Sequence, residues 1–62
     1  SHFGMDVEDV DAVYRDLCAK GVKIRSNGID ALPKPLGGGR AFSVFGPCGE
    51  VINFYEFNEK VV

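Results

Sequence analysis

The chain has 62 residues, 45% of them hydrophobic and 26% charged, which is the balance of one small globular domain spanning residues 1–62. Its formal net charge of -2 at pH 7 argues against a nucleic-acid partner, because nucleic-acid-binding proteins gain affinity by neutralising phosphates with Lys and Arg. No apolar run approaches the ~20 residues that cross a bilayer, so no membrane association is expected.

The cysteine content indicates a reducing compartment. Cys18 and Cys48 are too few for a disulfide framework and form no Cys-x-x-Cys pair, so we expect a cytoplasmic protein. A chain this short buries only about 60% of the surface that its unfolded form exposes. We therefore expect it to associate with a second copy of itself or with a second module.

The first third of the chain predicts a strand followed by a helix. Residues 2–7 alternate apolar side chains with polar or small ones, the period of a strand with one apolar face. Asp9 is the expected N-cap of a helix whose apolar residues recur at helical spacing as far as Cys18. Gly21 supplies the left-handed residue after the helix end. The helical phase of Leu17 predicts that its side chain is fully buried.

The rest of the chain predicts three more strands. Residues 22–25 form a short strand, and residues 26–39 are a long connection that contains Asn27-Gly28 and three successive glycines. A phosphate-binding interpretation of those glycines is weak, because they lead into a strand rather than a helix, so a hinge or turn is favoured. Residues 40–45 and 51–57 then form a hairpin across a Pro-Gly turn.

Strand alternation divides the hairpin into two faces. One face is continuously apolar and should pack beneath the helix: Phe42, Val44, Ile52 and Phe54. The other is mixed and should line a concave surface: Ala41, Ser43, Val51, Asn53 and Tyr55, joined by His2, Gly4 and Asp6. Glu56 belongs to the opposite side from Asn53, because an offset of three residues reverses the direction of a strand side chain.

Two segments carry a resemblance to a known family. Phe45-Gly-Pro-Cys-Gly-Glu-Val-Ile-Asn-Phe54 and His2-Phe-Gly-Met-Asp-Val-Glu-Asp-Val-Asp-Ala12 resemble the hallmark motifs of the vicinal-oxygen-chelate superfamily, which includes glyoxalases, bleomycin-resistance proteins and extradiol dioxygenases. The resemblance implies an α+β fold, with one βαβββ module made of a curved mixed sheet and one helix. Such a module is half of a two-module domain in this family.

The resemblance also implies site residues. Metal-dependent relatives present a His from the first strand and a Glu from the last, and those positions are His2 and Asn53 here. A partner would have to complete any site for zinc, nickel, manganese or iron, because a carboxamide is a weak ligand. Ser43, Asn53 and Tyr55 are the expected ligand-binding residues. The competing interpretations are a terminal or tag-derived histidine at His2, a hydrogen-bonding amide at Asn53 and a packing aromatic at Tyr55.

The expected function is therefore half of a small-molecule-binding cleft that lacks a complete metal site. The alternative is the C-terminal half or a subunit of a metal-dependent lyase, epimerase or dioxygenase, and a third hypothesis is a remnant of a larger enzyme. Residues 21–40 hold four basic residues against one acidic residue. This excess fits either a site for a small anion or, as the favoured interpretation, a solvated loop.

Overall fold

The computed structural model describes residues 2–58 and has one helix packed on a four-stranded sheet. In chain order, the elements are β1 (His2–Asp6), α1 (Val10–Ala19), β2 (Asp30–Ala31), the 3-10 helix η1 (Lys34–Leu36), β3 (Gly39–Phe45) and β4 (Val51–Phe57). The strand order is β1-β4-β3-β2, with β1 parallel to β4 and the other pairs antiparallel. This arrangement confirms an α+β fold with a single βαβββ module.

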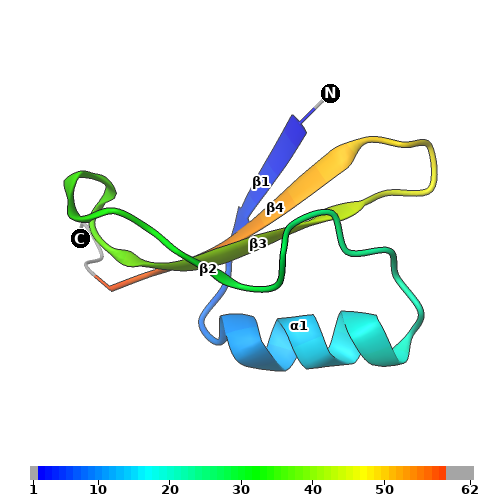
Figure 1. Ribbon diagram of the computed structural model, residues 1–62, viewed down its shortest axis with the longest axis horizontal. Helices are drawn as coiled ribbons and strands as arrows, with labels where there is room; N and C mark the ends of the chain where they lie inside the picture. The colour runs from blue at the N-terminus through cyan, green and yellow to red at the C-terminus, as the bar shows by residue number, and fades with distance from the viewer. Residues whose placement is uncertain (1, 59–62) are drawn as a thin grey trace.

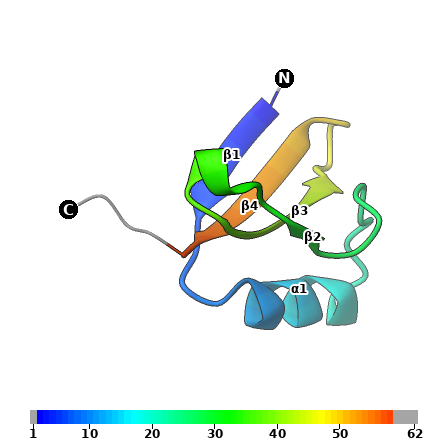
Figure 2. The same ribbon diagram turned by 60° about the vertical axis from the view of Figure 1, so that its left-hand side comes forward.

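The helix lies on one face of the sheet only. In Figures 1 and 2, α1 runs below the sheet and does not reach its upper face. The helix packs against β3 and β4, whereas β1 stands at the edge of the sheet. The helix α1 thus covers only one of the two faces of the sheet.

The ends of α1 follow the sequence-based prediction. The Asp9 side chain accepts a hydrogen bond from the Ala12 N–H at 3.1 Å, as an N-cap does. A second carboxylate, from Glu56 on β4, accepts from the Val10 N–H at 2.9 Å. Gly21 has a φ of 79°, which confirms the left-handed residue after the helix. The N-terminal turn of α1 is thereby fastened to the sheet.

The core lies between α1 and the hairpin. Its buried members are Val10, Phe42 and Val44. Around them pack partly buried apolar residues: Val7, Val13, Tyr14, Leu17, Val22, Ile24, Ile29, Ile52 and Phe54. The apolar face predicted for the hairpin is confirmed, but the prediction of full burial for Leu17 is wrong. A single helix on a small sheet leaves the side chains of its last turns at the perimeter of the core.

The prediction of a strand at residues 22–25 is also wrong. That segment makes an isolated antiparallel bridge between Ile24 and Val44, with backbone hydrogen bonds on either side of it. The paired strand β2 comes later, at Asp30–Ala31, inside the predicted connection. Apolar and basic residues alternate in Val22-Lys-Ile-Arg25, and this alternation indicates the direction of their side chains. Too few backbone hydrogen bonds form for the segment to be a strand.

The glycine run forms a turn rather than a phosphate loop. Gly37 ends η1 with a φ of 92°, and Gly39 opens β3 with a φ of 118°. A Cβ at Gly39 would lie 2.0 Å from the Glu56 carbonyl oxygen, so the close approach of β3 to β4 excludes any side chain there. These glycines therefore set the start of the hairpin.

Candidate functional site

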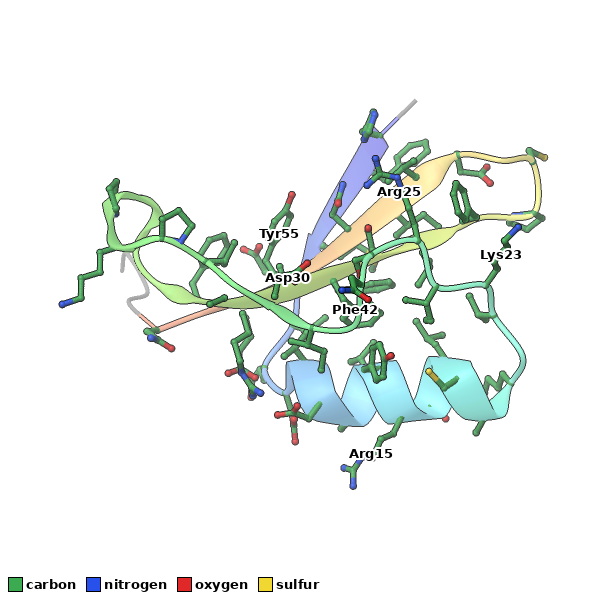
Figure 3. All side chains as sticks on the ribbon, in the orientation of Figure 1. Arg15, Lys23, Arg25, Asp30, Phe42 and Tyr55 are labelled. Atoms are coloured by element: carbon green, nitrogen blue, oxygen red, sulfur yellow. The ribbon has the colours of Figure 1, made fainter. Side chains whose placement is uncertain are left out.

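The candidate site is the sheet surface opposite α1, which we call the open face. The strand register places these residues on it: His2, Gly4 and Asp6 of β1, Ala41, Ser43 and Phe45 of β3, and Val51, Asn53, Tyr55 and Phe57 of β4. Figure 3 shows Tyr55 and Arg25 on this side, and Phe42 between sheet and helix. The structure thus brings all four sequence-predicted site residues to one face.

Ser43 lies on the predicted face but is only 4% exposed. The segment that holds Arg25 and Ser26 runs beside β3 at this position and makes hydrogen bonds with the Ser43 backbone, and the Arg25 side chain lies against the hydroxyl. Ser26 Oγ accepts from the Ser43 N–H at 3.0 Å, and the Arg25 N–H donates to the Ser43 carbonyl at 2.8 Å. Arg25 Nη1 lies 3.5 Å from Ser43 Oγ. A ligand on the open face would therefore meet the guanidinium of Arg25 before the hydroxyl of Ser43.

The donors at His2 and Asn53 do not fit a transition-metal site. Asn53 donates its amide N–H to the Phe3 carbonyl at 3.3 Å, which fixes the carboxamide as a cross-strand hydrogen-bonding group. The register pairs His2 with Val51, so His2 is offset from Asn53 by two strand residues, about 7 Å. Within residues 2–58, no group of three or more His, Cys, Asp or Glu side chains is placed to hold a metal ion.

The aromatic part of the open face lies beside β1. The rings of Tyr55 and Phe57 are stacked, with centroids 5.5 Å apart and an interplanar angle of 16°. A Cβ at Gly4 would lie 3.2 Å from Tyr55 Cε2, so the Tyr55 ring leans over the glycine. The absence of a side chain at Gly4 makes room for this ring. The result is a flat aromatic surface with a phenolic hydroxyl.

Two basic residues of the open face were not singled out from the sequence. Lys23 and Arg25 flank Ile24, and because Ile24 bridges Val44 and packs toward the core, its neighbours project to the other side. The Lys23 Nζ lies 5.5 Å from the centroid of the Phe45 ring. The alternation of apolar and basic residues in Val22-Lys-Ile-Arg25 is the signal that identifies them.

A second polar cluster lies on the helix side and is structural. Arg40 makes a two-pronged ion pair with Asp11 of α1, with Nη1 to Oδ1 at 3.0 Å, and its Nη2 lies 3.9 Å from a Glu56 oxygen. The hydrogen bond from Arg40 lowers the pKa of Asp11, and the same contact raises the pKa of Arg40. The expected position of Glu56 opposite Asn53 is confirmed. This cluster joins the helix start to the sheet.

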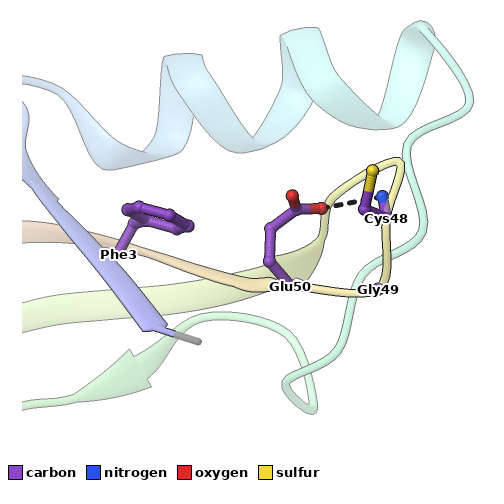
Figure 4. Close-up of a pocket in the computed structure, with 4 residues that line it drawn as sticks. All are labelled: Phe3, Cys48, Gly49 and Glu50. Atoms are coloured by element: carbon purple, nitrogen blue, oxygen red, sulfur yellow. Dashed lines mark hydrogen bonds between the residues drawn. The ribbon is translucent and has the colours of Figure 1, made fainter.

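A pocket of about 260 Å³ lies away from the open face, between β1 and the turn before β4 (Figure 4). It is lined by Phe3, Cys48, Gly49 and Glu50. Glu50 Oε1 accepts from the Cys48 N–H at 2.9 Å, so the carboxylate stabilises the turn. None of the residues predicted to bind a ligand lines this pocket.

Comparison with known proteins gives a match to a solved structure. No protein-family model matches the chain, and no curated protein sequence does. A solved structure described as a "conserved domain protein" is 31% identical to this chain, with a TM-score of 0.80 over 94% of it. The match covers 47% of that structure's chain, so this chain spans about half its length. Among residues 2–58, no helix has the length and apolar character needed to cross a membrane.

Proposed function

We propose that this protein is a small-molecule-binding module of the vicinal-oxygen-chelate type, with the open face forming half of a cleft. The observation that carries the proposal is the sheet face opposite α1, on which Asn53 and Tyr55 lie beside the small residue Gly4 and Arg25 lies beyond them, next to Ser43 of β3. Polar groups beside an aromatic surface are typical of ligand sites. The resemblance of the two motif segments supports the same class of protein.

A second module would supply the other half of the cleft. The edge strand β1 pairs only with β4 among the described strands, and its Phe3 and Met5 are 55% and 53% exposed. Exposed apolar side chains on an edge strand favour pairing with another chain or module. The twofold greater length of the similar solved structure fits this arrangement. We propose a homodimer or a second βαβββ module as the partner, in the cytoplasm.

The metal-dependent alternative depends on groups outside this module. A lyase, epimerase or dioxygenase of this family would need a partner to provide most of the ligands, because His2 and Asn53 offer one imidazole and one amide. The cross-strand hydrogen bond of Asn53 favours the binding function over the enzymatic one. We therefore place binding first.

The test is a fragment screen by two-dimensional NMR on the uniformly labelled protein. If the open face is the site, bound fragments shift the amide signals of Asn53 and Tyr55 and leave those of Arg15, on the outer side of α1, unchanged. Filling the face with Ala41→Trp should abolish these shifts. Fragments that shift only the signals of Phe3 and Cys48 would move the site to the pocket of Figure 4 and contradict the proposal.

A further inference from the structure

We propose that the open face selects a small organic anion with a planar apolar body, an aromatic carboxylate being the class it fits best. The inference rests on the proposed function, since it names the ligand of the same face. It starts from the four basic residues of positions 21–40, which the structure separates into different environments: Lys23, Arg25, Lys34 and Arg40.

Arg40 and Arg25 differ in what they contact. Arg40 lies on the helix side and is already paired with Asp11 and Glu56. Arg25 lies on the open face, and its described side-chain contact is with the neutral hydroxyl of Ser43. Among residues 2–58, Arg25 takes part in no ion pair. Its guanidinium keeps donors available for a carboxylate.

The base of Arg25 is held in place. Its N–H donates to the Ser43 carbonyl at 2.8 Å, and the neighbouring Ser26 closes a second hydrogen bond with the same residue. Ser43 is itself buried, so the guanidinium rests on a fixed hydroxyl. Preorganisation reduces the entropy lost when an anion binds. Lys23, two residues earlier on the same side, adds a second positive charge.

The opposite end of the open face, around Tyr55, provides the apolar surface for the ring of the ligand. The stacked rings of Tyr55 and Phe57 offer a flat apolar surface. Asp6 pairs with Tyr55 and Asp30 pairs with Ala41, so both carboxylates lie at this end of the face. Their charge opposes a ligand carboxylate there and favours it at Arg25. The face therefore orients a ligand with its charge at Arg25 and its ring at Tyr55.

The distance between the two ends suits a two-ring acid. From Arg25 to Tyr55 there are two strand spacings across the sheet and one two-residue step along it, about 12 Å between Cα atoms. The Tyr55 ring leans toward Gly4, away from Arg25, so the ligand has to extend across Asn53 to touch both groups, as an elongated two-ring acid does. Asn53, in the middle, offers its amide oxygen, since its N–H is used by Phe3.

The test compares 2-naphthoate with its neutral isostere 2-naphthamide by isothermal titration calorimetry. We expect naphthoate to bind more tightly, and Arg25→Gln to weaken naphthoate about tenfold, as loss of one charge-assisted hydrogen bond does, with naphthamide unaffected. Arg25→Lys should restore part of the affinity because it keeps the charge. The matched control is Arg15→Gln on the outer side of α1, which should change neither affinity (Figure 3).

The outcomes separate this inference from the proposed function. Equal binding of both compounds, with NMR shifts at Tyr55 but no effect of Arg25→Gln, would overturn anion selection and leave the open-face site intact. An equal loss of both compounds in Arg25→Gln would also overturn it, because Arg25 would then only shape the face. If neither compound shifts Tyr55 or Asn53 and the fragment screen also leaves them unchanged, the proposed function fails as well.

Discussion

The two faces of the sheet use the same strands and differ in what covers them. On the helix face, Phe42 is 2% exposed and contacts Phe54 at 5.0 Å and Tyr14 at 5.1 Å between ring centroids. On the open face, Tyr55 and Phe57 also stack, on the side of the sheet that α1 does not cover. Aromatic pairing therefore occurs on both faces. Burial depends on the position of α1, which leaves the second set of rings available to a ligand or partner.

The largest expected difference in stability is between the replacement of a buried aromatic residue on the helix face and that of an exposed one on the open face. Phe42→Ala should lower the free energy of unfolding by about 3–5 kcal/mol, because it removes a buried ring and leaves a cavity. Phe45→Ala, where the residue is 36% exposed on the open face, should cost less than about 1 kcal/mol. Chemical denaturation of both variants measures the difference. Equal costs would mean that the open face is covered in solution.

The packing of α1 against the sheet should give the next largest effect on the free energy of unfolding. Leu17 is only half-buried, so Leu17→Ala should cost about 1–2.5 kcal/mol, less than a fully buried leucine would. Arg15→Ala, on the exposed side of the same helix, should be close to neutral. A cost above about 4 kcal/mol for Leu17→Ala in urea unfolding would restore the prediction of full burial.

Association through β1 should be sensitive to one charge. Met5 is 53% exposed, so Met5→Lys should weaken self-association about tenfold or more if this strand meets a second copy, since it places a charge in an apolar contact. Phe45→Lys is the matched control on the opposite face. Sedimentation velocity over a concentration series measures both. A wild-type protein that stays monomeric at high micromolar concentration would rule out the homodimer.

The smallest effect concerns the ion pair at the start of α1. Arg40 lowers the pKa of Asp11 below its usual value of 3.8, so the pair stabilises the fold above that pH. The contribution is lost as the pH falls through the lowered pKa of the folded state. Asp11→Asn should thus be slightly less stable than wild type at pH 7, and the difference, measured by chemical denaturation, should disappear once the pH lies below the lowered pKa of Asp11. Because the pair is exposed, the gap should also shrink in high salt.

The sequence pattern predicted which residues lie on the open face, but not which of them are buried there. Alternation placed His2, Asn53 and Tyr55 correctly, because side-chain direction in a strand is a local property. The burial of Ser43 is not predicted by the pattern, since it depends on the contacts of Arg25 and Ser26 with a strand residue seventeen or eighteen positions later in the chain. A contact of that kind leaves no mark on the local pattern.

By itself, the sequence determined the local geometry: the cap at Asp9, the left-handed Gly21, the turn before β4 and the two faces of the hairpin. Each depends on backbone preferences or on a short period. The tertiary structure decided which element covers which face, and so assigned Arg40 to an ion pair and Arg25 to the open face. Both residues are arginines within the same basic segment. Only the packing of the chain gives one of them a carboxylate partner and leaves the other available for a ligand.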